Sequence, residues 1–335
     1  MNTIILRRRK LGKTSCEEIQ KNLKESYNID SFAGRIDQNP PNPDILVRWG
    51  CTNTLRSNFE INSSDKIHLV NDKANCRKLF QDNNVSVPKS FFTKEDTRNA
   101  SLYPLIGRER YHHQGRHLKF IRNDSELNED HSSNYWSQYI TKEKEFRVFV
   151  FFGKVIMVAE KEFHGDHDSI AWNVAQGAVS FKNVRWNDWP LRVCEEALKA
   201  QKITGIDFAG VDVMIKDNIP YILELNSAHS LTDGYRQKTF AKALAWAIKY
   251  IEKKNIKPDH FVIPNRIRNY KDIILPAIED YEKAINDLET NIRIEAKIIY
   301  PEWFNSFLNS FRGDTNNDKK ETMLHFIKSY LEHVK

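Results

Sequence analysis

Residues 205–229, GIDFAGVDVMIKDNIPYILELNSAH, constrain the fold of this chain more than any other stretch. Apolar side chains alternate with other residues over 209–215 and again over 221–225, which predicts two β-strands. The intervening KDNIP contains the residues of a tight turn, so the two strands should form a β-hairpin. Because residues two apart on a strand share a face, Glu224 and Asn226 should point to the same side of the sheet.

The spacing between the two strands predicts a candidate metal site. If the loop is residues 217–219, Asp212 lies directly opposite Glu224, whereas a shift of one residue would turn Asp212 to the other face. Two carboxylates and the Asn226 amide on one face repel each other without a cation, and they are the oxygen ligands that suit Mg²⁺. The alternative is a solvated, inert hairpin with an acidic residue at each end. A covered sheet face argues against it, and four apolar residues predict such a face: Val211, Val213, Leu223 and Leu225.

Composition excludes several classes of protein. In 335 residues, 40% hydrophobic and 11% aromatic content predict a packed core with room for two or three domains. No apolar run approaches about 18 residues, so no membrane span is expected. The start, MNTIILRRRK, is the reverse of a secretory signal, and the four cysteines show no disulfide framework, which favours a cytoplasmic protein. Lys+Arg 51 against Asp+Glu 45 allows an anionic substrate but is not the imbalance of a dedicated DNA-binding domain.

The first 50 residues predict a strand–helix–strand unit, with strands at 2–7 and 44–49 and a helix at 14–27 capped by Thr14 or Ser15. Gly12-Lys13-Thr14 is not a phosphate loop, because position 7 holds arginine instead of the first glycine.

Two groups of residues in this unit are candidate anion contacts. Arg48 and the loop 50–53 lie at the carboxyl end of the second strand, where open α/β sheets bind ligands. The run Arg7, Arg8 and Arg9 is interpreted as a solvated strand edge rather than an anion site.

The run GVDVM…YILELNSA resembles the end of the ATP-grasp fold, most closely in carboxylate–amine ligases of the ribosomal-protein glutamate ligase and D-alanine–D-alanine ligase kind. In that family the Asp, Glu and Asn of this motif hold the magnesium ions that bind ATP, which by resemblance means Asp212, Glu224 and Asn226. At position 210 this sequence has glycine, which resembles the glutamate-ligase relatives, whereas D-alanine ligases carry arginine there. His229 and Ser230 depart from the family's usual Pro-Gly.

NDKANCRKLFQDNNVSVPKSFF resembles the entry to the ATP-grasp small lobe, in which Lys73, early in a helix at 72–80, approaches nucleotide phosphate. Strands are predicted at 102–108 and 117–121, joined by a loop around Gly115 whose backbone N–H groups would face phosphates. Arg108 stands where the family usually has lysine, and it retains the charge. The loop histidines, His112 and His113, are interpreted as polar loop residues rather than substrate contacts.

The middle of the chain continues the resemblance. Gln138-Tyr139-Ile140 should line the adenine pocket, and Glu145 should bind the ribose hydroxyls. Arg147 and Lys161, on predicted strands 145–152 and 154–161, alternate with apolar residues. They face either solvent or the acceptor and γ-phosphate, and both alternatives are left open. Asn173 lies in a segment that resembles the family's N-x-x-x-G and would help to order phosphates or the metal shell, and a helix is predicted at 189–204.

The resemblance implies an α+β ATP-grasp fold of two lobes clasping ATP, preceded by a small α/β lobe. The expected segments are a pre-ATP-grasp lobe (1–70), a small lobe (71–141), a large lobe (142–255) that ends in a helix at 238–252, and a helical extension (256–335) outside the resemblance.

The activity that the resemblance implies is ATP-dependent amide formation through an acylphosphate. Arg108, Arg147, Lys161 and Asn173 would contact the phosphates, the transferring group or the acceptor. ATP and two Mg²⁺ are the implied cofactors, with Mn²⁺ as an alternative. The substrates would be a small-molecule or peptide carboxylate and an amine. The rival functions are an ATP-grasp kinase and a non-catalytic ATP-binding scaffold, and nucleic-acid binding and homo-oligomer formation are left open.

Overall fold

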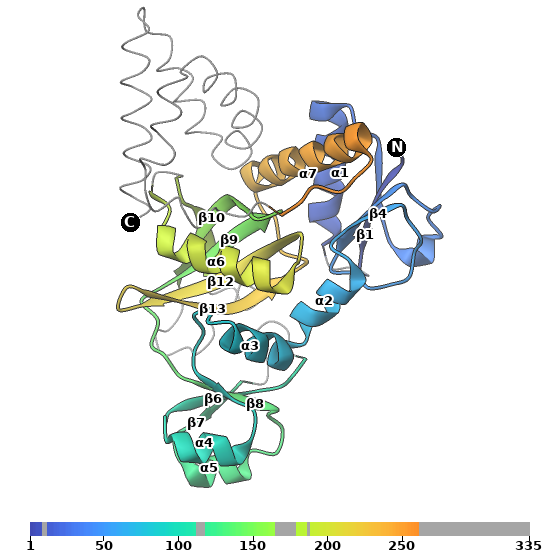
Figure 1. Cartoon of the computed structure of the whole chain (residues 1–335). Helices are drawn as coiled ribbons and strands as arrows, with labels where there is room; N and C mark the ends of the chain where they lie inside the picture. Colours follow the sequence, from blue (N-terminus) through green and yellow to red (C-terminus); the bar gives the residue numbers. More distant parts are fainter. Residues whose placement is uncertain (9–11, 112–117, 165–178, 186–187, 261–335) are drawn as a thin grey trace, which may run out of the picture.

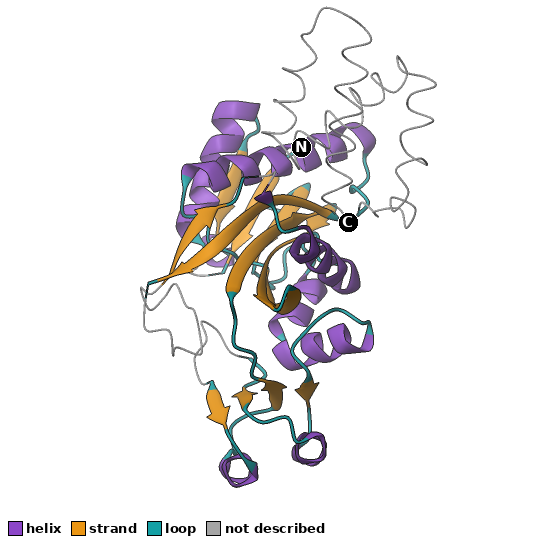
Figure 2. Cartoon of the chain, turned by 90° about the vertical axis from the view of Figure 1, so that its left-hand side faces the viewer, coloured by secondary structure: helices purple, strands orange, loops and turns teal. Residues whose placement is uncertain are grey.

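The computed structural model of this chain describes residues 1–8, 12–111, 118–164, 179–185 and 188–260, which form three β-sheets with helices packed around them (Figures 1 and 2). Each sheet falls within one of the first three expected segments. The predicted C-terminal helices lie outside the described residues. No helix in the described ranges is long and apolar enough to cross a bilayer.

The N-terminal sheet is parallel and has the order β2-β1-β3-β4, formed by β2 (Ser31–Gly34), β1 (Thr3–Arg7), β3 (Ile45–Trp49) and β4 (Phe59–Ile61). Helix α1 (Lys13–Tyr27) connects β1 to β2, a short 3₁₀ turn η1 (Ile36–Gln38) follows β2, and α2 (Ser64–Asn71) leads out of the sheet. The predicted strand–helix–strand unit is therefore present, with β2 inserted into it. Strand β1 lies between β2 and β3 and Arg7 is buried, so the interpretation of Arg7 as a solvated edge residue was wrong; Arg8 is exposed, and Arg9 lies outside the described residues.

Two other predictions in this lobe need correction. The N-cap of α1 is Gly12, not Thr14 or Ser15, and the Ser15 hydroxyl accepts a hydrogen bond from the Leu231 backbone N–H at 3.1 Å instead. Arg48 does lie near the carboxyl end of β3, but it is buried and donates to Glu60 at 2.8 Å and to the Asn53 carbonyl at 2.6 Å. Its guanidinium group therefore serves the local structure.

The second sheet is small and antiparallel, with the order β5-β8-β6-β7. Its strands are β5 (Ser90–Phe91), β8 (Tyr135–Gln138), β6 (Leu105–Arg108) and β7 (Lys119–Ile121). Helices α4 (Lys94–Ala100) and α5 (Asp124–Glu129) lie side by side against one face, as Figure 2 shows. Helix α3 (Lys73–Asp82) precedes this sheet and lies between it and the central sheet (Figure 1).

The central sheet is antiparallel with the order β11-β10-β9-β12-β13. Its strands are β11 (Val179–Asn183), β10 (Lys154–Phe163), β9 (Lys144–Phe151), β12 (Phe208–Lys216) and β13 (Ile219–Asn226). One face packs on α6 (Leu191–Thr204) and α3 through a valine-rich cluster. On the other face α7 (Gly234–Lys254) buries an aromatic cluster and also contacts α1, which joins the N-terminal lobe to the sheet (Figure 1).

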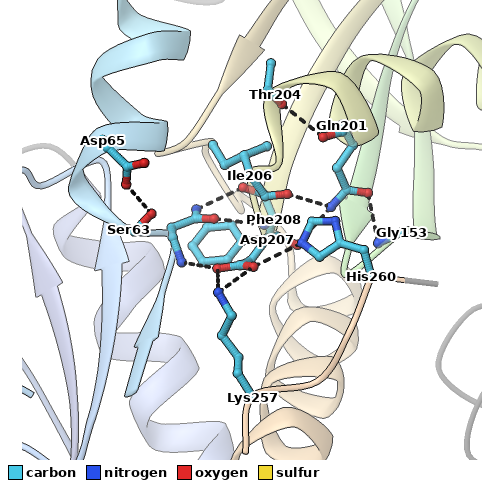
Figure 3. A network of polar contacts seen from close by, with 11 residues as sticks. Ser63, Asp65, Gly153, Gln201, Thr204, Ile206, Asp207, Phe208, Lys257 and His260 are labelled. Atoms are coloured by element: carbon cyan, nitrogen blue, oxygen red, sulfur yellow. Dashed lines mark hydrogen bonds and ion pairs between the residues drawn. The ribbon is translucent and has the colours of Figure 1, made fainter. Parts of the chain in front are cut away.

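A buried polar junction fixes the N-terminal lobe to the start of β12 (Figure 3). The Asn62 backbone N–H donates to Asp207 at 2.7 Å, and the Asn62 side chain exchanges two 2.9 Å hydrogen bonds with the Phe208 backbone. Lys257 and His260, beyond α7, contact the same Asp207 carboxylate at 3.1 and 3.0 Å. The first lobe, the strand that carries Asp212 and the residues after α7 therefore meet at one carboxylate.

Candidate active site

The β12–β13 hairpin places Asp212 opposite Glu224, and Gly210 opposite Asn226. The turn contains only Asp217 and Asn218, both with positive φ, because Lys216 pairs with Ile219. If the pairing continued without a shift from Lys216 and Ile219, Leu223 would lie opposite Asp212. A β-bulge between Asp212 and Val213 shifts the pairing by one residue and restores Glu224. The predicted carboxylate pair is confirmed, whereas the three-residue loop proposed to produce it was wrong.

Arg77 on α3 holds the bulged strand in place. Its Nη1 donates to the Ile222 carbonyl at 2.8 Å and its Nη2 to the Leu223 carbonyl at 2.6 Å. The side chain is buried, and this burial lowers the pKa of Arg77 to about 10. Sequence reasoning missed this residue, although Lys73 and Arg77 lie four positions apart and therefore share one face of the helix.

One row of residues crosses all five strands of the central sheet. The pairing registers align Asn183, Ala159, Arg147, Asp212 and Glu224 in order from β11 to β13. Directly paired residues of antiparallel strands point to the same face. The sheet thus brings together three predicted site residues, Arg147, Asp212 and Glu224, from three separate strands.

Ion pairs connect this row to its neighbours. Arg147 binds Asp212 with two hydrogen bonds, from Nε at 2.7 Å and from Nη2 at 2.8 Å. Lys161 donates to Asp212 at 3.0 Å and to Glu145, whose other oxygen accepts from Lys142 at 2.7 Å. The solvent-facing alternative for Arg147 and Lys161 is therefore wrong.

The two carboxylates of the hairpin are held in their ionised form. Burial by itself would raise the pKa of Asp212, but Arg147 and Lys161 outweigh it and hold that pKa well below its usual range. Burial likewise acts to raise the pKa of Glu224, but Lys73, the hydrogen bond from Asn226 and the charge of Lys161 together outweigh it, so that the pKa of Glu224 falls to about 2. Lys73 Nζ lies 3.4 Å from Glu224 Oε2 and donates to the Leu225 carbonyl at 3.2 Å.

The start of α3 fixes the position of Lys73. Asp72 is the N-cap, accepting the Asn75 N–H at 3.1 Å, and it also binds Arg110 Nε at 2.8 Å. The Lys73 N–H donates to the Arg110 carbonyl at 3.0 Å. Since Arg110 follows β6, the residues that leave the small sheet hold Lys73 against the central sheet.

The donor set fits a hard cation. Asp212 Oδ1 accepts one hydrogen bond, and a carboxylate oxygen has capacity for another. Asn226 donates its Nδ2 to Glu224 at 3.0 Å, and its side-chain oxygen Oδ1 accepts no hydrogen bond from the described residues. No group of three or more His, Cys, Asp or Glu side chains in the described ranges is arranged to hold a metal. A metal here would rely on two carboxylates and one amide, with the rest of its coordination supplied by phosphate and water, as Mg²⁺ commonly does.

The other predicted contacts are placed as follows. Arg108 ends β6 and donates to Ser137 at 3.2 Å. Gln138 ends β8, and the Tyr139 N–H donates to the Pro104 carbonyl at 3.0 Å before the chain continues through half-buried Ile140 toward β9. The remaining predicted residues lie outside the described residues: Gly115, His112, His113 and Asn173.

Among the described residues, cationic side chains outnumber carboxylates around this site. Three carboxylates, Glu145, Asp212 and Glu224, are surrounded by six cationic side chains: Lys73, Arg77, Arg108, Lys142, Arg147 and Lys161. Burying such an excess of charge is unfavourable without counter-ions. The site is therefore suited to a polyanionic ligand.

Comparison with known proteins agrees with this arrangement. Residues 70–229 match the family model described as an ATP-grasp domain. A probable alpha-L-glutamate ligase of Shewanella halifaxensis is 30% identical over 236 residues, which are 62% of this chain and 48% of that protein. A coenzyme gamma-F420-2:alpha-L-glutamate ligase of Methanococcus maripaludis is 23% identical over 215 residues, 57% of this chain and 70% of that protein. The chain thus spans about half the length of the first of these relatives.

Solved structures share the fold. The ATP-grasp ligase PsnB, in complex with a minimal precursor, Mg and ADP, aligns with a TM-score of 0.54 at 14% identity, over 72% of this chain and 96% of that one. The D-alanine–D-alanine ligase of Bacillus anthracis aligns with a TM-score of 0.54 at 15% identity, over 76% and 99%. This chain therefore has the ATP-grasp fold, matches the ATP-grasp domain model over residues 70–229, and is similar to carboxylate–amine ligases built on that fold.

Proposed function

We propose that this chain is an ATP-dependent carboxylate–amine ligase. The observation that carries the proposal is the row Arg147–Asp212–Glu224, in which two ionised carboxylates lie within a surplus of cations. Phosphoryl transfer requires this kind of setting, because charge spreads over the phosphoryl oxygens and catalysis consists largely of positioning and charge neutralisation. The relatives named as glutamate ligases support the same class of reaction.

The proposed reaction has two steps. The γ-phosphoryl group of ATP passes to a substrate carboxylate oxygen, which gives an acylphosphate and ADP. The amine nitrogen then attacks the acyl carbon, the bond to the phosphate oxygen breaks, and an amide and inorganic phosphate are formed while the amine loses a proton. The carboxylate substrate is a small molecule or a peptide.

The metal and phosphate ligands are assigned from the charged row and its surroundings. Asp212, Glu224 and Asn226 would hold Mg²⁺, as two ions, with Mn²⁺ as a substitute. The metal would supply charge neutralisation on the phosphates. Lys73 and Arg108 would contact phosphate oxygens, since both lie where the small sheet approaches the central one.

The remaining residues would bind the rest of the nucleotide and the reacting groups. Arg147 and Lys161 would stabilise the transferring group, joined by Asn173. Gln138, Tyr139 and Ile140 would contact the adenine, Glu145 the ribose, and the backbone at Gly115 the phosphates. In this structure each oxygen of Glu145 accepts from one lysine, so a ribose hydroxyl would use the remaining acceptor capacity of the carboxylate.

The organisation of the chain is part of the proposal. Residues 1–70 would form the pre-ATP-grasp lobe, 71–141 and 142–255 the two lobes that clasp the nucleotide, and 256–335 an extension. All four cysteines are free and buried, which fits a reducing, cytoplasmic environment.

A pooled substrate screen tests the proposal. Wild type and Glu224→Gln are incubated with Mg·ATP, pooled carboxylates and pooled amines, and ADP and amide products are measured by mass spectrometry. We expect ADP and amide to form together with wild type and to fall at least about 100-fold in the variant, because the metal pair loses one charge. Glu195→Gln, at an exposed site on α6, is the matched control and should keep full activity. A stable phosphoester in place of the amide would contradict ligase activity, and equal turnover by Glu224→Gln would contradict the metal assignment.

A further inference from the structure

The far end of the charged row, at β11 and the first turn of α7, holds polar groups that the proposed reaction does not use. Arg236 is only 3% exposed, and its Nε and Nη2 both bind Asp233, the N-cap of α7. Its third nitrogen, Nη1, is buried and has no hydrogen-bond partner among the described residues. An unpaired guanidinium N–H is unfavourable in a folded protein, so a native structure that retains one calls for an explanation in terms of function.

A second unpaired group lies beside the first. Asn183 on β11 donates its Nδ2 to the same Asp233 carboxylate at 3.3 Å, while its Oδ1 is buried and, within the described ranges, has no partner. Asp233 thus orients an arginine and an asparagine side by side. Each of the two presents one unused group, a donor on Arg236 and an acceptor on Asn183.

Phe181 links these groups to the candidate active site. The guanidinium carbons of Arg236 and Arg147 lie 5.4 and 4.9 Å from the centre of its ring, and Lys161 Nζ lies 5.9 Å from it. Three cationic centres therefore surround one aromatic ring, and Arg147 is the group bound to Asp212. Asn183 occupies the same row as Arg147 and Asp212, so these three side chains share one face of the sheet.

We propose that Arg236 and Asn183 form a subsite for the terminal carboxylate of an α-amino-acid unit, either a free amino acid or the C-terminal residue of a peptide. The carboxylate would accept from Arg236 Nη1, and the neighbouring N–H of the same unit would donate to Asn183 Oδ1. This carboxylate is separate from the one that is activated, and in the complete reaction it holds the substrate beside Arg147. The assignment of the substrate to the reaction rests on the proposed function.

The geometry favours this ligand over a simple anion. Chloride would satisfy the arginine but would leave the asparagine oxygen unpaired, whereas a carboxylate flanked by an N–H satisfies both. Asp233 already neutralises one positive charge at Arg236, so a singly charged group is better matched than a phosphate. Because Nη1 is shielded from water in this structure, binding requires a local opening.

Direct binding to the full chain tests the subsite without depending on turnover. Calorimetry and thermal shift are measured with two sets of probes, the free L-amino acids and their N-acetyl derivatives, in the presence and absence of Mg·ADP. The matching carboxamides and decarboxylated amines serve as controls. We expect at least one carboxylate set to bind and its controls to bind at least about tenfold more weakly. The set that binds identifies the source, since N-acetyl derivatives imitate the end of a peptide.

Variants separate the subsite from general effects. Arg236→Gln should weaken carboxylate binding at least about tenfold, and Arg236→Lys should restore part of it, because it keeps the charge but not the fork of donors. Arg192→Gln, at an exposed arginine in the first turn of α6, is the matched control and should bind like wild type. If Arg236→Gln does not fold, Arg236→Lys and Asn183→Ser, each of which should bind more weakly, provide the comparison.

Three results would overturn the subsite: no carboxylate binds under either condition, carboxamides bind as well as carboxylates, or Arg236→Gln binds like wild type. Failure of the proposed function gives a different pattern, in which Mg·ATP is not bound or turned over whatever the outcome of the carboxylate titrations.

Discussion

Gly210 allows two side chains of the site to approach β12, and replacing it with alanine is the sharpest structural test. A Cβ at this position would lie 2.9 Å from the His229 Cβ and 3.2 Å from the Arg147 Cδ, whereas ordinary contact begins near 3.4 Å. Neither neighbour can move freely, because His229 is packed among aromatic rings and Arg147 is bound to Asp212. The substitution therefore forces a shift of about half an ångström in a packed region, for which overpacking costs about 1–3 kcal/mol.

Intrinsic preference predicts the opposite sign. Gly210 has no positive φ, and alanine in place of a strand glycine is worth about 0.5–1 kcal/mol of stability. Gly234→Ala is the matched control, because it lies in the first turn of α7 with nothing within 4 Å of the added Cβ. Urea unfolding should show Gly210→Ala less stable than wild type by about 1–3 kcal/mol and Gly234→Ala equal or slightly more stable. The shift should also lengthen the Arg147–Asp212 hydrogen bonds and weaken Mg·nucleotide binding. If Gly210→Ala were as stable as wild type and bound nucleotide equally well, the packing described here would be wrong.

Three further predictions concern stability. Burial lowers the pKa of His229 to about 3 from 6.5, so the unfolded chain takes up the proton first as pH falls. Between about pH 7 and about pH 5, the free energy of unfolding of wild type, measured with urea in EDTA, should therefore fall by about 2 kcal/mol more than that of His229→Leu. Equal losses in the two proteins would contradict this. Asn62→Ala removes two buried hydrogen bonds at a residue of positive φ and should lower the free energy of unfolding by about 3 kcal/mol. The control Asn84→Ala, at an exposed residue that shares only the positive φ, should cost about 1 kcal/mol. Equal costs would contradict a stabilising role for the Asn62–Phe208 hydrogen bonds. Arg77→Met should remove the hydrogen bonds to the Ile222 and Leu223 carbonyls and lower the free energy of unfolding by about 2 kcal/mol in chemical denaturation. It should also weaken Mg·nucleotide binding, and unchanged binding would show that the bulge does not depend on Arg77.

The hairpin could be predicted from sequence because its signal is local. Alternating apolar residues and a turn sequence determine two paired strands whatever surrounds them. The exact register was not local. The turn is one residue shorter than expected, and a bulge held by Arg77 from α3 compensates for it. A helix some 145 residues away in sequence therefore helps to decide which residue Asp212 faces.

Other elements were missed for reasons that differ in kind. Helix α5 lies in a polar stretch with one buried apolar residue, Leu127, so the hydrophobic pattern could not indicate it. Its capping signal was present, because Asn123 accepts the Glu126 N–H at 3.0 Å and Glu126 accepts the Arg122 N–H at 2.8 Å. Strand β2 is short and carries no apolar alternation, so nothing in its sequence indicated that it pairs with β1 and makes β1 an inner strand.

The site itself was predicted only in part. The pairing of Asp212 with Glu224 followed from spacing, but the sequence could not show that Arg147 and Lys161 neutralise Asp212. Those contacts depend on the order β10-β9-β12, which pairs strands that are distant in sequence. Phe181 and Arg236 carried no recognisable sequence signal either, because their contacts also join elements that are distant in sequence.

The most direct test of the site is the Mg²⁺ dependence of nucleotide binding. A non-hydrolysable ATP analogue is titrated calorimetrically into wild type, Glu224→Gln and Glu195→Gln, with Mg²⁺ and with EDTA. We predict that Mg²⁺ tightens binding to wild type and to Glu195→Gln at least about tenfold and has little effect on Glu224→Gln, because the hairpin carboxylates hold the metal against the phosphates. Equal Mg²⁺ dependence in all three proteins would contradict the assignment of the Asp212–Glu224 pair as the metal site.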